Sequence, residues 1–355
     1  MRFAWVFVAA TAGCSFDLPK EATVDGATLD SSDRLVCFGA SNGLVKPCFL
    51  TEPAGDITLS APIDTDSSGM CMTPMSGGAG YCVIAANNIQ IGDTVAASGS
   101  KPLVLVANSS ITIASGATLD VASHHSPTQK IGAGAGSPDC MAGTIPTAGG
   151  SGGGGGAGGT FAGAGGTGGN GAGGVGAGGR PSAVQTATTL RGGCPGQNGI
   201  NGTFGAGGNG GGAVYLIAKT SITIAGAINA SGEGGHFGVT GSAGGGGGGS
   251  GGMIGLDAST ITNSGAVFAN GASGGEGSGV GVPGTLGPEP TTAAASAPAA
   301  GGTNNGGDGG GGSAGGATAA GGNGLNGVGG GGGGVGVIKV FGGGTLAGNH
   351  SPPPS

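Results

Sequence analysis

The sequence has few charged and few aromatic side chains. Only 8% of its residues are charged and 4% are aromatic, whereas about a quarter of the residues in an ordinary soluble domain carry a charge. The net charge of -7 makes nucleic acid and anionic membrane surfaces poor partners. The single tryptophan, Trp5, lies in the N-terminal apolar run, so the rest of the chain has no indole for stacking on sugars.

Motifs for catalysis and for metal binding are also scarce. The G-x-S-x-G pattern occurs at Ser151, Ser250 and Ser313, but glycines surround each serine, whereas a nucleophile elbow needs a strand before it and a helix after it. Calcium-binding glycine repeats need a recurring aspartate, and the last glycine tract has only Asp308. Carbohydrate-cleaving β-helices need clustered acids and bases. The sequence therefore predicts no enzymatic activity, no cofactor and no bound metal.

No apolar run is as long as the roughly twenty residues that a membrane-spanning helix needs. The longest near the N-terminus, Phe3 to Ala10, follows Arg2 and precedes small residues, which is the layout of a secretory signal peptide over residues 1–13. We therefore expect an exported protein.

The end of this segment, Ala12-Gly13-Cys14, resembles the lipobox of bacterial lipoproteins. The resemblance implies that Cys14 carries lipid and anchors the mature protein to a membrane. Thr11 departs from the pattern, which usually has leucine there. An alternative is ordinary signal cleavage after Ala12, which would leave Cys14 unmodified.

Six further cysteines remain from the total of seven. An even number of cysteines in an exported chain indicates disulfides. Six cysteines allow fifteen connectivities, and pairing by proximity is the simplest of them. It joins Cys37 to Cys48, Cys71 to Cys82 and Cys140 to Cys194.

Glycine is what the sequence has in excess, with 96 residues. Each glycine costs about 0.5 to 1 kcal/mol relative to alanine when it is fixed in regular structure, so the glycine tracts are either flexible or packed backbone to backbone. A recurrence of glycine at every third residue, as from Gly165 to Gly174, is compatible with polyproline-II-like geometry. The sequence leaves both possibilities open.

Between the tracts, a β-rich unit of three short segments recurs. Its copies begin near Val104, Val214 and Met253, with a degenerate copy at Val83 and a truncated one at Val335. Such repeats predict an all-β fold, a short parallel β-solenoid (β-helix) with glycine-rich insertions and a small disulfide-braced N-terminal cap. Alternation places Ile111, Ile113, Ile222, Ile224 and Ile261 inward, and Thr112, Thr223 and Thr262 in an outward row.

The pattern divides the chain into consecutive segments. After the signal peptide come an acidic tether (14–32), the cap (33–82), the first coils (83–126), a glycine-rich insert (127–211), further coils (212–270), a glycine/alanine-rich insert (271–334), a last strand segment (335–349) and a tail (350–355). His124 and His125 could offer a pair of metal ligands, but no third histidine lies near them in sequence, so we expect an exposed polar corner there.

The chain from Cys14 to Leu346 resembles the uncharacterised glycine-rich surface lipoproteins of bacteria, and PE-PGRS proteins in composition only. The stretch Leu190 to Gly196 and the junctions into Ala213 and Met253 carry the resemblance. It implies an exported protein at the outer membrane or cell surface, anchored through Cys14. We expect a non-enzymatic structural or adhesive role for it. The partners would be extracellular polysaccharide or surface proteins. The alternatives are a polysaccharide-binding or polysaccharide-acting β-helix and, third, an ice-binding protein that uses the threonine row.

Overall fold

The computed structural model describes residues 35–355, with gaps at 127–128, 150–151, 172–175, 298, 300–305, 317 and 319. Leu35–Ser355 forms one compact unit. The signal peptide, Cys14 and the acidic tether lie outside the described residues.

The described residues form strands and no helix. Two short strands, β1 (Val36–Cys37) and β2 (Cys48–Phe49), pair antiparallel in the N-terminal part. The other strands are β3 (Asp56–Leu59), β4 (Ile63–Asp64), β5 (Cys82–Ile91), β6 (Val95–Ser98), β7 (Leu103–Ile113), β8 (Thr118–Asp120), β9 (Ala213–Ala218), β10 (Ser221–Ile224), β11 (Ala227–Asn229), β12 (Met253–Asp257), β13 (Thr260–Asn263), β14 (Ala266–Phe268), β15 (Val337–Phe341) and β16 (Asn349–Ser351).

These fourteen strands build two larger sheets in which every pairing is parallel. The eight-stranded sheet has the order β13-β10-β7-β9-β12-β15, and β5 joins β3 to β7. The six-stranded sheet has the order β16-β14-β11-β8-β6-β4. The recurring sequence units supply equivalent strands, because Ile111, Ile222 and Ile261 are partners in register on β7, β10 and β13.

The predicted β-solenoid is wrong. The sheets are open, layered and parallel, and they do not close into a regular coil. Parallel strands need crossover connections of a dozen or more residues, and here long glycine-rich segments form them: β8 ends at Asp120 and β9 begins only at Ala213. The short polar corners between the strands of one repeat favour a continuous solenoid in the sequence pattern. In the structure, the crossovers between repeats leave the sheets and pack on one another.

Two apolar clusters lie on the two faces of the eight-stranded sheet. Strand β7 contributes Leu103 and Leu105 to the larger cluster, which fills the space between the sheets, and Val104 and Val106 to the smaller one. Because both faces of this part are covered, the strand is a continuous apolar run. Towards its end β7 alternates, with Ile111 and Ile113 fully buried.

All three disulfides predicted by proximity are present. Cys37 pairs with Cys48, Cys71 with Cys82 and Cys140 with Cys194. The first two brace the N-terminal segment, and the third closes the longest loop, across the first glycine-rich crossover. The described residues contain no helix long and apolar enough to cross a membrane.

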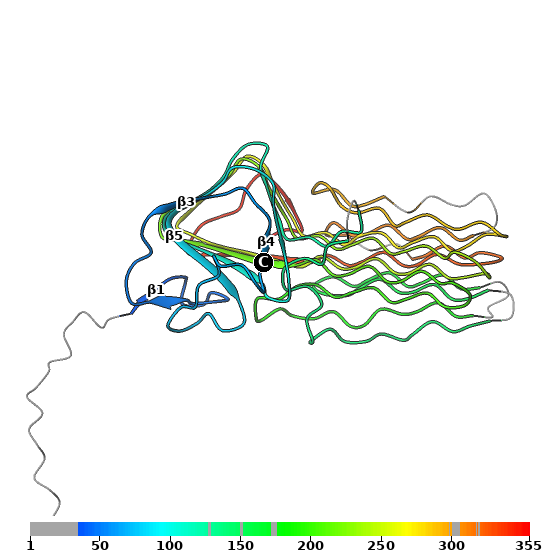
Figure 1. Ribbon diagram of the computed structural model, residues 1–355. Helices are drawn as coiled ribbons and strands as arrows, with labels where there is room; N and C mark the ends of the chain where they lie inside the picture. The colour runs from blue at the N-terminus through cyan, green and yellow to red at the C-terminus, as the bar shows by residue number, and fades with distance from the viewer. Residues whose placement is uncertain are drawn as a thin grey trace, which may run out of the picture. The chain divides into compact units, whose positions relative to one another are not determined.

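The described glycine-rich segments lie side by side and hydrogen-bond to one another (Figure 1). We call them the glycine bundle: residues 152–171, 192–212, 230–252, 269–278, 306–315 and 320–336. Their bonds recur every third residue, as the Gly156 amide donates to Gly245 at 2.9 Å and the Gly159 amide to Gly248 at 2.8 Å. A repeat of three residues is compatible with polyproline-II geometry. Because the hydrogen bonds join the backbones of different tracts, the tracts are packed backbone to backbone.

Packing at this distance leaves no room for a side chain. A Cβ added at Gly247 would lie 2.0 Å from the carbonyl oxygen of Ala157, and one added at Gly332 would lie 2.0 Å from that of Gly311. Both obstacles are backbone atoms, which cannot rotate away. Glycine is required at these positions by the closeness of the neighbouring tract.

Replacing Gly247 with alanine should therefore destabilise the protein by about 3 kcal/mol or more, since overpacking against backbone forces the tracts apart. Urea unfolding measures the change. The matched control is Gly316→Ala, because a Cβ there would meet nothing within 4 Å. That variant should be neutral or stabilised by about 0.4 to 1 kcal/mol. Equal effects of the two substitutions would contradict close packing of the bundle.

Candidate functional site

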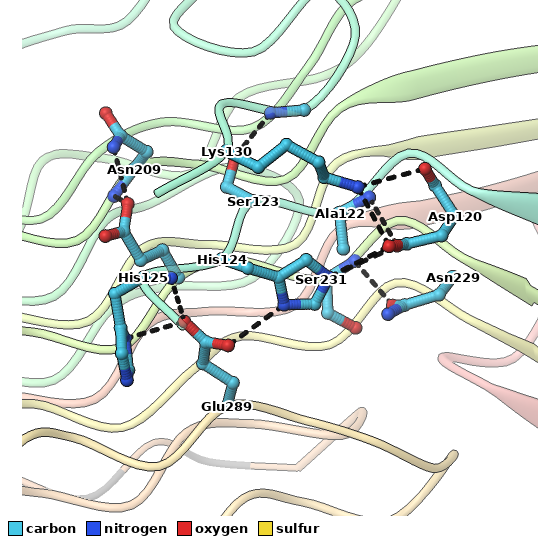
Figure 2. Close-up of polar contacts among 12 residues, drawn as sticks. Asp120, Ala122, Ser123, His124, His125, Lys130, Asn209, Asn229, Ser231 and Glu289 are labelled. Carbon is cyan, nitrogen blue, oxygen red and sulfur yellow. Dashed lines mark hydrogen bonds and ion pairs between the residues drawn. The ribbon is translucent and has the colours of Figure 1, made fainter. Parts of the chain in front are cut away.

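The main cluster of charged side chains lies where the chain leaves β8 and enters the first glycine-rich crossover. Asp120 ends β8, and the backbone of His124 then pairs with that of Lys130 through two hydrogen bonds of 2.8 and 2.7 Å. This short loop places His124, His125 and Lys130 beside Asp120 (Figure 2). Glu289 comes to the same place from 165 residues further along the chain.

One carboxylate, Glu289, holds both histidines. His124 Nδ1 lies 2.9 Å from Glu289 Oε2, and His125 Nδ1 lies 2.7 Å from Glu289 Oε1. The backbone amide of His125 also donates to Oε1 at 2.8 Å. On its other side, His124 Nε2 lies 3.1 Å from Asp120 Oδ2, which in turn accepts a hydrogen bond from Lys130 Nζ at 2.8 Å. We call Asp120, His124, His125, Lys130 and Glu289 the junction cluster.

A third carboxylate, Glu233, extends the cluster into the glycine bundle. It is fully buried, accepts a hydrogen bond from the Asn209 amide at 3.0 Å and lies 3.3 Å from His236 Nε2. The rings of His236 and His125 meet edge to face with centroids 6.0 Å apart. Buried carboxylates are costly unless they are paired, and both Glu233 and Glu289 are.

Pairing sets the protonation states in the cluster. Burial opposes the charged form of His124, but hydrogen bonds from its ring to Asp120 and Glu289 raise its pKa to about 9. Burial would raise the pKa of Glu289, yet the two histidines lower it to about 2. The pKa of His125 is raised, mainly by its bond to Glu289. At neutral pH His124 is therefore an imidazolium between two carboxylates.

This arrangement suits structure better than catalysis. Both ring nitrogens of His124 face carboxylates, so the ring offers no lone pair to take a proton from a nucleophile or to ligate a metal. The neighbouring Ser123 hydroxyl donates to the Gly210 carbonyl at 2.6 Å, away from His124. No group of three or more His, Cys, Asp or Glu side chains in the described ranges could hold a metal ion.

The junction cluster holds the segment around Glu289, which belongs to the crossover between β14 and β15, against the loop after β8. The segment around Glu289 runs along the glycine bundle, with the Gly287 amide donating to Gly235 at 2.9 Å and the Pro288 carbonyl accepting from Ser273 at 3.1 Å. Glu289 ties this segment to the loop after β8. The junction cluster thus links the six-stranded sheet to the segment around Glu289, which lies between the bundle tracts 269–278 and 306–315.

The expectation of an exposed polar corner at His124 and His125 is wrong. Their side chains are only 23% and 13% exposed, because Asp120 and Glu289 cover them. Asp120 stands four residues before His124 and could have been noticed in the sequence. Glu289 could not, since nothing local connects it to the histidines.

The threonine row lies in register on the sheet surface. Thr112, Thr223 and Thr262 are partners on β7, β10 and β13. Thr112 and Thr223 are half-buried and Thr262 is exposed. Beside them Ser110, Ser221 and Thr260 form a second row. The structure brings these residues together but places them apart from the junction cluster in the fold, on the other large sheet. Cys14 lies outside the described residues.

The comparisons with known proteins give no relative: no family model matches the chain, and no curated protein or solved structure is significantly similar to it. The resemblance to glycine-rich surface lipoproteins therefore stays a prediction from the sequence.

The junction cluster predicts how stability depends on pH. The pKa of His124 rises from 6.5 to about 9 on folding, so its stabilisation is complete below pH 6.5 and is lost as the pH rises through about 9. The pKa of Glu289 falls from 4.5 to about 2, so its stabilisation is complete above pH 4.5 and is lost as the pH falls through about 2. Urea unfolding should show both contributions in full between pH 4.5 and 6.5.

Glu289→Gln should lower the free energy of unfolding by about 1 to 3 kcal/mol in this window, because hydrogen bonds to a charged group are lost. The difference from the unchanged protein should shrink above about pH 9, as His124 loses its proton. Glu52→Gln is the matched control, since Glu52 is 53% exposed in its pair with Lys219 and exposed pairs contribute little. A pH-independent loss in Glu289→Gln would contradict the assigned charges.

Proposed function

We propose that the protein is a non-enzymatic, exported surface lipoprotein with a structural or adhesive role at the cell envelope. The observation that carries the proposal is the glycine bundle, a backbone lattice without space for catalytic side chains inside it. Such packing supports a rigid body that holds its turns in fixed positions. Rigidity of this kind suits presentation of a surface rather than turnover of a substrate.

Export is supported by the disulfides. Three disulfides brace the described residues, and such bonds persist in oxidising compartments such as the bacterial periplasm and the cell exterior. The signal-like N-terminus points the same way, and Cys14 supplies the expected anchor. A single acyl chain binds membranes weakly, so stable anchoring needs more than one chain.

The adhesive role rests on what the bundle exposes. Each glycine-rich crossover leaves the end of one strand and returns to the start of another. The turns near residues 200–204, 279–282 and 323–327 close hydrogen-bonded pairs of tracts. Phe204, Val280 and Leu325 occupy three such turns and are 45%, 68% and 65% exposed. In this proposal these three side chains are the ones that contact a partner surface. Extracellular polysaccharide or another surface protein would be that partner.

Cys14→Ser should release the protein from the membrane fraction into the soluble fraction, because the acyl anchor can no longer form. Ser15→Ala keeps Cys14 and serves as the control. Fractionation followed by mass spectrometry of the mature N-terminus measures the outcome. A mature chain that begins at Gly13, or unchanged fractionation of Cys14→Ser, would show that Cys14 is not the anchor.

The adhesive role is tested by a separate experiment. Cells that display the protein with Phe204, Val280 and Leu325 all replaced by serine should bind less to cells or surfaces than cells displaying the unchanged protein. Normal adhesion of this variant at equal surface amounts would contradict the adhesive role while leaving the anchoring result untouched.

A further inference from the structure

Arg191 is a buried cation outside the junction cluster. It is only 8% exposed and lies against the disulfide between Cys140 and Cys194, with Nη1 3.8 Å from the first sulfur and 4.0 Å from the second. Its guanidinium carbon stands 4.4 Å from the centre of the Phe161 ring. Nη2 donates to the side-chain oxygen of Gln185.

These neighbours leave the charge of Arg191 without an anion. None of the ion pairs formed within the described ranges includes Arg191, although buried charges are normally paired. Sulfur accepts hydrogen bonds only weakly, and an aromatic ring compensates a charge only in part. Burial lowers the pKa of Arg191, and the negative charge of Asp139 opposes this only partly.

A second donor beside Arg191 also has no acceptor. The side-chain nitrogen of Gln185 is buried without a hydrogen-bond partner, while the oxygen of the same amide accepts from Arg191. A buried polar group without a hydrogen-bond partner destabilises the folded protein. Gln185 does not line the cleft that Arg191 lines, so Arg191 is the charged donor through which this cleft can hold an acceptor from outside the chain.

Arg191 lines a cleft of about 400 Å³, within the range of small-molecule sites. Tyr81, Ser100, Asp139 and Thr189 line it as well. Three of these side chains carry hydroxyl groups. Asp139 is exposed and makes no ion pair with Arg191, so it adds one negative charge to the rim of the cleft.

We propose that this cleft binds the carboxylate of a small hydroxylated acid through Arg191. A guanidinium favours a carboxylate as its partner, and a bound carboxylate supplies the counter-charge that no ion pair of Arg191 provides. The hydroxyl-bearing side chains around it suit the hydroxyl groups of the same molecule. The acid comes either from an acidic sugar unit or from a free organic acid. The site is independent of the lipid anchor and of the turns of the glycine bundle.

The proposal is tested by titrating the disulfide-intact exported protein with glucuronate, glucose and acetate. Calorimetry measures the affinity of each compound, and the NMR signals of the arginine Nε–H groups show which arginine it contacts. Glucuronate should bind and shift the Arg191 signal, and glucose should not. Arg191→Met should weaken glucuronate binding at least about tenfold, since a charge-assisted hydrogen bond contributes about 1.5 to 3 kcal/mol. Arg180→Gln, at an exposed arginine, should bind as the unchanged protein does.

Asp139→Asn keeps the proposal testable if Arg191→Met does not fold, because Asp139 is exposed. Removing its negative charge from the rim should tighten glucuronate binding by about two- to fivefold, the size of an exposed charge interaction. Glucuronate binding tighter than acetate assigns the acidic sugar as the source, and equal binding assigns a free acid. Unchanged affinity in a folded Arg191→Met variant, equal binding of glucose, or no binding of glucuronate and acetate would overturn the proposal.

Discussion

The rest of the structure depends on backbone hydrogen bonds between glycine tracts. Amides at every third residue donate to the neighbouring tract, as at Gly156 and Gly159, and the tracts approach so closely that a Cβ would meet carbonyl oxygens at about 2 Å, as at Gly247 and Gly332. Glycine loses more conformational entropy on folding than any other residue. The bundle offsets that cost because the backbone N–H and C=O groups of many tracts find hydrogen-bond partners in one another. We therefore expect that no single tract is ordered alone.

This constraint explains how the sheets can be parallel without helices. Parallel strands require long crossovers, and crossovers that carry unpaired backbone groups would be unfavourable in a packed layer. Here each crossover finds its hydrogen-bond partners in the other crossovers. The junction cluster then fixes the ends of this arrangement, because Glu289 connects the segment beside the bundle to the loop that follows β8. Charge is scarce in the chain, and the junction cluster pairs Lys130 and Glu289, which both follow β8, with Asp120 and the two histidines.

Local patterns in the sequence predict the local features well. The alternation at Ile111 and Ile222 identifies their buried faces, and cysteine spacing identifies all three disulfides. The predicted β-solenoid is wrong, because the periodicity of the sequence shows that the strands of the repeats are equivalent but does not show the path of the segments that connect them. The cluster was missed for the same reason. His124 and Glu289 are 165 residues apart, and only the tertiary fold brings them together.

Native-state amide hydrogen exchange of the disulfide-intact protein tests the central claim most directly. The amides of residues 153–159, 244–252 and 329–334 are hydrogen-bonded across tracts at many positions. They should exchange as slowly as the amides in β7 and β12, with protection lost from the tracts together as denaturant is added, because each tract depends on its neighbours. Exchange of these glycines at the rate of an unfolded chain, while β7 and β12 stay protected, would contradict a bundle held together by its backbone.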